Sequence, residues 1–254
     1  MSTTSLITGA SSGLGAEYAR QLAARGARLV LVARDRNALD ELAIHLRERF
    51  AVPVEVLAAD LLKPRDLKRV VERIQDTDDP VELLINNAGF GLPLSFASNE
   101  IEEELRHLHL HVEVPMRLMH AALPGMLDRG HGRIVNVASV AAFMPRSTYG
   151  ACKRWLVDFS RWATAEYSRR GVTVTAVCPG FTHTRFHERM GLAPGAEGVP
   201  HWAWLNAEDV VFESLRDIAH GKPVSVPSLR YKLAVKVLSV LPKRVAARVG
   251  STGR

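Results

Sequence analysis

The sequence predicts an α/β fold, a parallel sheet of about seven strands with helices on both faces. Three observations predict it. The chain has 254 residues, 47% of them hydrophobic, which suits one large domain with a sizeable core. Short apolar, β-branched segments alternate with longer segments of helical period, as in βαβ units. Polar motifs follow several of the apolar segments.

The elements follow in a regular order. The first half of the chain reads SLIT, GLGAEYARQLAARG, ARLVLVA, RNALDELAIHLRERF, PVEVLAA, PRDLKRVVERIQ and VELLINN, alternately strand and helix. The second half continues with a long helical segment at 100–129, GRIVNVA, YGACKRWLVDFSRWATAEYSRR, VTVTAVC, a helix near 206–220 and KPVSVP. Pro115 lies inside the long segment and predicts a kink there.

Composition excludes several classes of protein. Residues 218–254 hold eight Lys or Arg and no acid, so the net charge of +6 belongs to the tail. The first 217 residues balance 25 basic against 27 acidic side chains, and supply no basic face interleaved with aromatics, so nucleic acid is not an expected partner. LAVKVLSVL is about half as long as a bilayer-spanning helix.

The cysteines and the N-terminus favour a cytoplasmic protein. Cys152 falls in a predicted helix and Cys178 at a strand end, positions typical of small core residues rather than of a disulfide framework. MSTTSLITGA enters an apolar strand almost at once, so no secretory signal is expected.

Four motifs stand where predicted strands end. Residues 8–15 (TGASSGLG) follow the first strand and lead into a helix, where glycines let the backbone approach a pyrophosphate. A plain strand-to-helix turn is the alternative. NNAG at 86–89, Ser139, and Cys178-Pro179-Gly180 follow three later strands. Parallel strands bring all four motifs to one edge of the sheet, where open sheets bind ligands.

Tyr149 and Lys153 lie four residues apart on a predicted helix. At this spacing the phenol and the ammonium share one face. Any helix surface can carry such a pair, so the pair alone does not indicate catalysis.

Together these motifs make the chain resemble the classical short-chain dehydrogenase/reductase (SDR) family. The resemblance runs through TGASSGLG, NNAG, Ser139, Tyr149-x-x-x-Lys153 and PGFTHT at 179–184. It implies a Rossmann-type doubly wound fold, a nicotinamide cofactor and hydride exchange between a carbonyl and an alcohol. Residues 1–228 would form the NAD(P)-binding catalytic domain, with a substrate loop at about 183–205, and residues 229–254 a basic amphipathic C-terminal extension.

The resemblance implies four catalytic residues: Ser139, Tyr149, Lys153 and His111. Tyr149 would be the acid. A phenol pKa of about 10 must fall by about three units, or about 4 kcal/mol, to reach neutrality, and Lys153 would favour that shift. Ser139 would hold the substrate oxygen, although the interval to Tyr149 is shorter than usual. His111 stands where most members carry a water-holding asparagine, and a relay role and a structural role are both open.

The resemblance also implies the residues that bind the cofactor. They are Gly9, Ser11, Ser12, Gly13, Leu14, Gly15, Arg34, Asp60, Leu61, Asn87, Ala88, Gly89, Tyr149, Lys153, Pro179, Gly180, Thr182 and Thr184. Ala33 replaces the acid of NAD enzymes and Arg34 suits a 2′-phosphate, so NADP(H) is preferred and NAD(H) is the alternative. Asp35 could instead draw Arg34 into a surface pair, and Asp60 could cap a helix near Pro64.

Substrate and partners are less constrained. Six residues could line a cleft for an apolar, lipid-like or steroid-like substrate or simply pack: Phe90, Phe143, Phe181, Met190, Trp202 and Trp204. The pairs His107/His111 and His183/His187 lack a third ligand, so no metal is expected. The resemblance also implies a homo-oligomer, a dimer or tetramer, because family members commonly associate through the helices that match 100–129 and 149–170. Peripheral contact of the tail with anionic lipid is open but not favoured, because Pro242 shortens any helix.

The alternative to an enzyme is a nucleotide-sensing or regulatory protein that keeps the fold and turns over little. His111 and the shortened interval between Ser139 and Tyr149 would explain it. The presence of all three of Ser139, Tyr149 and Lys153 argues against it.

Overall fold

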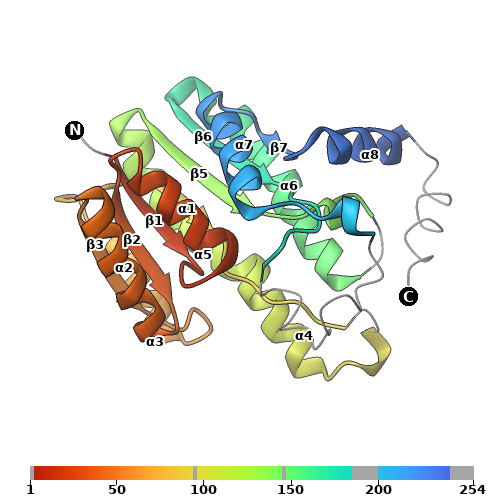
Figure 1. The fold of residues 1–254 in the computed structure, drawn as a ribbon, viewed down its shortest axis with the longest axis horizontal. Coiled ribbons are helices and arrows are strands. Elements are labelled where there is room, and N and C mark those ends of the chain that lie inside the picture. The colour runs from red at the N-terminus through yellow and green to blue at the C-terminus, as the bar shows by residue number, and fades with distance from the viewer. Residues whose placement is uncertain (1–2, 94–95, 145–146, 185–199, 241–254) are drawn as a thin grey trace.

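One parallel sheet organises the chain (Figure 1). The computed structural model describes residues 3–93, 96–144, 147–184 and 200–240. Within them the sheet has seven strands in the order β3-β2-β1-β4-β5-β6-β7. The strands are β1 (Thr4–Thr8), β2 (Arg28–Ala33), β3 (Val54–Ala58), β4 (Val81–Asn86), β5 (Gly132–Val137), β6 (Val172–Val177) and β7 (Val224–Ser225). The predicted α/β fold is confirmed.

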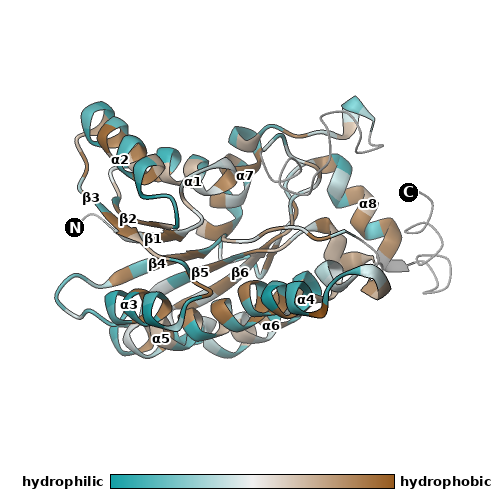
Figure 2. Cartoon of the chain, turned by 90° about the horizontal axis from the view of Figure 1, so that it is seen from below, coloured by the Kyte–Doolittle hydropathy of each residue, from teal (hydrophilic) through white to brown (hydrophobic). Residues whose placement is uncertain are grey.

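Helices cover both faces of the sheet (Figure 2). They are α1 (Gly13–Ala23), α2 (Arg36–Phe50), α3 (Pro64–Ile74), α4 (Ile101–Leu108), α5 (Val114–Arg129), α6 (Thr148–Tyr167), α7 (Ala207–Ala219) and α8 (Leu229–Val240). Successive strand residues point to opposite faces, so one core joins β1 and β2 to α1, α2 and α7 through Ile7 and Leu31. A second core joins the sheet to α3, α5 and α6 through Leu6 and Val30.

The strand order reverses between β1 and β4, which places a topological switch point at their carboxyl ends. Thr8 ties the two strands together there. Its hydroxyl donates to Ile85 O at 3.3 Å and accepts from the backbone N–H groups of Asn87 at 2.9 Å and Ala88 at 3.1 Å. The ends of these two strands are thus held in register where a ligand would cross them.

The long segment 100–129 is interrupted in the turn that precedes Pro115. A π-helical turn, His109–Glu113, separates α4 from α5. Pro115 lies in the first turn of α5, but the backbone before it is already helical, so its missing N–H leaves a carbonyl of the π-helical turn without the usual helical donor. The irregularity therefore lies just before the predicted kink, and it carries His111. Single π-turns of this kind are frequent at functional sites.

The described part of the C-terminal region ends in α8, which follows β7. Leu229, Leu233 and Val237 are exposed along this helix. Residues 185–199 of the expected substrate loop, with His187 and Met190, and residues 241–254 of the extension, with Pro242, lie outside the described residues. Among the helices that are described, none combines the length and the apolar character that crossing a membrane would require.

Candidate active site

The glycine-rich turn after β1 requires its glycines. Gly9 and Gly13 have φ angles of +67° and +55°, which L side chains rarely adopt. A Cβ atom on Gly15 would lie 2.2 Å from the carbonyl oxygen of Gly9. Asn87 holds the turn from β4, because its Nδ2 donates to Thr8 O at 2.8 Å and to Gly9 O at 3.2 Å.

The other residues predicted in this turn take different positions. Ser12 is the N-cap residue of α1, and Leu14 packs against the core. A Cβ atom on Gly13 would lie 3.2 Å from Thr184 Cβ, so the turn after β1 meets the segment after β6. The backbone N–H groups at the start of α1 are therefore framed by motifs from β1, β4 and β6, at a helix end suited to anionic phosphate.

Arg34 and Asp60 follow β2 and β3 at the same edge. The Arg34 side chain is exposed, and none of the described acidic groups pairs with it. The Asp35 carboxylate instead caps α2, accepting from Ala38 N at 3.1 Å, so the surface pair is not formed. Asp60 does not cap α3 either: its Oδ1 accepts from Leu62 N at 3.1 Å in a local turn, and Leu61 is buried.

Ser139, Tyr149 and Lys153 come together at the ends of β5 and α6. The Ser139 hydroxyl accepts from Ala141 N at 3.1 Å and hydrogen-bonds to Tyr149. Ser147 caps α6, accepting from Gly150 N at 3.2 Å, which fixes Tyr149 in the first turn. Lys153 is 5% exposed, and its Nζ donates to Val137 O at 2.6 Å while lying 5.6 Å from the Tyr149 ring centroid.

The pKa of Tyr149 moves opposite to the expected direction. Burial raises it to about 12, and the hydrogen bond from Ser139 offsets only part of that rise. Burial also lowers the pKa of Lys153 to about 8, since the ammonium is poorly solvated. The ammonium lies 5.6 Å from the ring centroid and donates to a strand carbonyl, and it does not reverse the rise that burial causes in the pKa of Tyr149. Tyr149 is therefore a neutral phenol at pH 7.

His111 and His107 stand beside this cluster. Their rings lie 4.2 Å apart, centroid to centroid, and 5.7 Å and 5.9 Å from the Tyr149 ring. His111 Nε2 lies 2.8 Å from Phe90 O and 3.2 Å from Phe90 N, and a Cβ atom on Gly89 would lie 2.5 Å from His111 Cε1. His111 thus packs against the NNAG motif, as a structural residue would.

Each of these two histidines also carries one buried, unpartnered ring nitrogen, His107 Nε2 and His111 Nδ1, among the described residues. Burial lowers the pKa of His107 to about 4 and that of His111 well below its usual value, so both rings are neutral at pH 7. A neutral ring nitrogen beside Tyr149 also has the chemistry of a relay. Both roles of His111 remain compatible with the geometry.

The segment after β6 is tied to a residue that the sequence patterns did not single out. Pro179 O accepts from Val140 N at 3.0 Å, and the Thr182 hydroxyl donates to Gly180 O at 3.0 Å. Tyr231, on α8, packs its ring directly against Gly180. A Cβ atom on Gly180 would lie 2.1 Å from the nearest ring atoms. Tyr231 stands in a cationic tail with no neighbouring motif, so only the tertiary structure brings it to the site.

The aromatic residues expected in an apolar cleft differ in their surroundings. Phe143 packs against a buried cluster that includes Ala142 and Leu156. The ring of Trp204 lies 4.8 Å from that of His183 and 5.8 Å from that of Phe181. Trp202 is 67% exposed, which leaves it available for contact.

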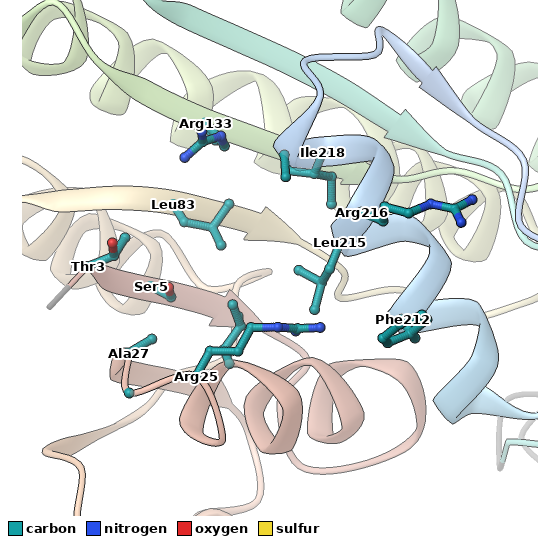
Figure 3. Close-up of a pocket in the computed structure, with 13 residues that line it drawn as sticks. Thr3, Ser5, Arg25, Ala27, Leu83, Arg133, Phe212, Leu215, Arg216 and Ile218 are labelled. Carbon is teal, nitrogen blue, oxygen red and sulfur yellow. The ribbon is translucent and has the colours of Figure 1, made fainter.

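A pocket of about 470 Å³ lies at the opposite edge of the sheet, where β1 begins (Figure 3). Its lining includes Ser5, Leu215, Arg25 and Arg216, and none of the candidate site residues. Arg25 and Arg216 stand near the C-terminal ends of α1 and α7, where cations complement the helix dipole. A third arginine of the lining, Arg133, lies on β5. The described residues gather no group of three or more His, Cys, Asp or Glu side chains that could hold a metal ion.

A doubly wound parallel sheet, with a glycine turn at its switch point and a Ser–Tyr–Lys cluster at the same edge, defines a Rossmann-type protein. A family model described as short chain dehydrogenase matches residues 3–193. The chain belongs to the short-chain dehydrogenase/reductase family, a family of oxidoreductases that interconvert carbonyls and alcohols with a nicotinamide cofactor.

Three relatives illustrate the likeness. A short-chain dehydrogenase from Sphingobium yanoikuyae, solved in complex with NADPH, is 35% identical, with a TM-score of 0.86 over 99% of this chain and 96% of that one. A bulky-bulky ketone specific alcohol dehydrogenase from Comamonas testosteroni is 32% identical, with a TM-score of 0.81 over 99% and 95%. The 3-oxoacyl-[acyl-carrier-protein] reductase of Escherichia coli is 31% identical over 70% of this chain and 73% of its own.

The residues at the sheet edge fit a nicotinamide dinucleotide. Glycine stands at the positions of the turn where a side chain would strain the backbone or meet Gly9 O. The start of α1 faces this cradle, and its first turn carries no acidic side chain to repel phosphate.

Proposed function

We propose that the protein is an NADP(H)-preferring carbonyl reductase or alcohol dehydrogenase acting on an apolar, lipid-like or steroid-like ketone, aldehyde or secondary alcohol. The observation that carries the proposal is the cluster of Ser139, Tyr149 and Lys153 at the dinucleotide edge. Residues 1–228 form the catalytic domain of this proposal. The buried free thiols of Cys152 and Cys178 fit a reducing cytoplasm.

The NADP(H) preference rests on Arg34. Its guanidinium is exposed next to the position where NAD enzymes carry an acid, and none of the described carboxylates occupies it. A guanidinium suits a 2′-phosphate because it offers a fork of N–H donors to the phosphate oxygens. The NADPH complex of the Sphingobium yanoikuyae relative supports the same preference.

The apolar substrate rests on the neighbouring aromatic side chains and on the relatives. Phe181 and Trp204 pack together in the segments that flank residues 185–199, and Trp202 is exposed beside them. One relative acts on bulky ketones and another on 3-oxoacyl chains, as their names state.

The chemistry follows from the protonation states. A bound nicotinamide cofactor would supply the hydride to the carbonyl carbon, or accept it from the alcohol carbon in the reverse direction. Tyr149, a neutral phenol at pH 7, donates its proton to the carbonyl oxygen as negative charge develops there. Ser139 steadies that oxygen with its hydroxyl. Lys153 stabilises the phenolate that remains and would bind the nicotinamide ribose, as in the family.

Phosphate, adenine and nicotinamide would each meet a different part of the edge. The backbone of residues 9–15 would hold the pyrophosphate at the start of α1. Asp60 and Leu61 would face the adenine. Asn87, Ala88 and Gly89 would line the ribose path, while the segment from Pro179 to Thr184 would sit against the carboxamide and phosphates.

The Tyr149→Phe variant tests the proposal against the nucleotide-sensing alternative. NADPH binding is followed by fluorescence and carbonyl reduction by the loss of NADPH absorbance. The enzyme should lose turnover by about 10²- to 10⁴-fold, the usual contribution of a general acid, and should still bind NADPH. The matched variant is Tyr167→Phe, because none of the described residues hydrogen-bonds to the Tyr167 hydroxyl. A wild type that binds NADPH but reduces no carbonyl from a panel graded by size would favour the sensor.

A homo-oligomer, a dimer or tetramer, is part of the proposal. Exposed apolar side chains occur on three helices: Leu105 and Leu108 on α4, Met116 on α5 and Trp162 on α6. Such patches often mark contacts between subunits. Size-exclusion chromatography with light scattering tests this, and a monomer at micromolar concentration would contradict it.

A further inference from the structure

The two chain segments that flank residues 185–199 are joined at their bases. Thr182 and Leu205 form a parallel bridge. Phe181 O accepts from Leu205 N at 2.8 Å, and His183 N donates to Leu205 O at 3.0 Å. The outgoing segment, which follows β6, and the returning segment, which leads into α7, therefore lie side by side.

One side chain of α8 binds both segments. The Tyr231 hydroxyl accepts from Phe181 N at 3.2 Å and donates to Ala203 O at 2.8 Å. Its ring fills the space above Gly180, where even a methyl group would lie 2.1 Å from ring carbon atoms. Tyr231 thus uses both its hydroxyl and its ring on the segment that would meet the nicotinamide.

α8 is itself anchored so that the tyrosine cannot move freely. Lys232 Nζ pairs with Glu213 Oε2 on α7 at 3.2 Å, and Ser228 N donates to the same carboxylate oxygen at 3.2 Å. Arg230 donates to the carbonyl oxygen of Trp202, a second contact with the returning segment. The helix is therefore fixed to α7 on one side and to the returning segment on the other.

We propose that Tyr231 is a positioning residue, which holds the Gly180–Thr184 segment against the dinucleotide site and sets its distance from the glycine turn. The proposal rests on the proposed function, because it names what fixes that site. The far end of the segment reaches the turn at Thr184, whose Cβ atom would lie 3.2 Å from a Cβ atom on Gly13. Displacement at Gly180 is thus passed along a short, hydrogen-bonded segment to the phosphate cradle.

The Tyr231→Phe variant tests this in the full-length protein. It keeps the ring over Gly180 and removes the hydroxyl, leaving Phe181 N and Ala203 O without that partner. We expect the dissociation constant of NADPH and the KM for the carbonyl to rise by up to about tenfold, because binding must then also restore the position of the segment, at a cost limited by the one or two neutral hydrogen bonds that were lost. The pH profile of kcat should stay unchanged, because Tyr149 and Lys153 are not touched.

Tyr167→Phe is the control for loss of a hydroxyl elsewhere, and it should leave both constants unchanged. A merely structural Tyr231 would lower the melting temperature of Tyr231→Phe but leave the NADPH dissociation constant and the KM within twofold of wild type at 25 °C, which overturns the proposal. Failure of the proposed function is distinct: the wild type itself would then bind no NADPH or reduce no carbonyl.

Discussion

The affinity for NADPH should fall above pH 8 because Lys153 loses its proton there. Burial lowers the pKa of Lys153 from 10.5 to about 8, which corresponds to about 3 kcal/mol against the charged form. The ammonium is fully formed well below pH 8 and is lost as the pH rises through 8. The pKa in the ligand-free protein sets where the affinity begins to fall, and the higher pKa in the complex sets where the fall ends.

The size of the effect follows from the bond that is lost. A charge-assisted hydrogen bond from the ammonium to the ribose is worth about 1.5–3 kcal/mol, or about 10- to 100-fold in the dissociation constant. Fluorescence titration between pH 7.5 and 10 measures it, and NADH titrated in parallel excludes protonation of the cofactor's own 2′-phosphate. Tyr149→Phe should keep the same dependence, because the phenol stays protonated in this range. Two results would refute the assignment to Lys153: an NADPH dissociation constant that does not change up to pH 10, or a pH dependence of that constant that disappears in Tyr149→Phe.

Two further outcomes are expected. Arg34→Ala should weaken NADPH binding about 10- to 100-fold, the worth of charge-assisted hydrogen bonds to a phosphate, and should leave NADH binding unchanged; equal losses for both cofactors would contradict the role of Arg34. The stability of the protein should fall between pH 6.5 and about 4, because His107 and His111 stay neutral in the fold while the unfolded chain takes up protons. Urea unfolding at pH 7 and 4.5 measures the change in the free energy of unfolding. In His107→Gln the number of protons taken up on unfolding should be smaller by about one; an unchanged pH dependence in that variant would show that other groups cause the loss of stability.

The sequence predicted the fold well because local signals agreed with one another. The helix RNALDELAIHLRERF was predicted from its period and is α2, Arg36–Phe50, with Asp35 as its cap. Motifs at strand ends were predicted to share an edge because parallel strands leave no other arrangement. Those inferences needed only the period of apolar residues and the direction of the strands.

What the sequence could not predict depends on burial and on distant contacts. The pKa of Tyr149 was expected to fall, but spacing along a helix says nothing of how far water is excluded from the phenol. The hydrogen bond from Lys153 Nζ to Val137 O depends on how α6 packs against β5. Tyr231 lies 50 residues from the Phe181 N–H group that it binds, and no period or motif links the two.

The bridge between Thr182 and Leu205 has a consequence for the length of the chain that joins them. The chain leaves the first of these residues and returns to the second at adjacent points. A longer or shorter connection between them would therefore leave the spacing of β6 and α7 unchanged, and the site residues that precede Thr182 would keep their positions.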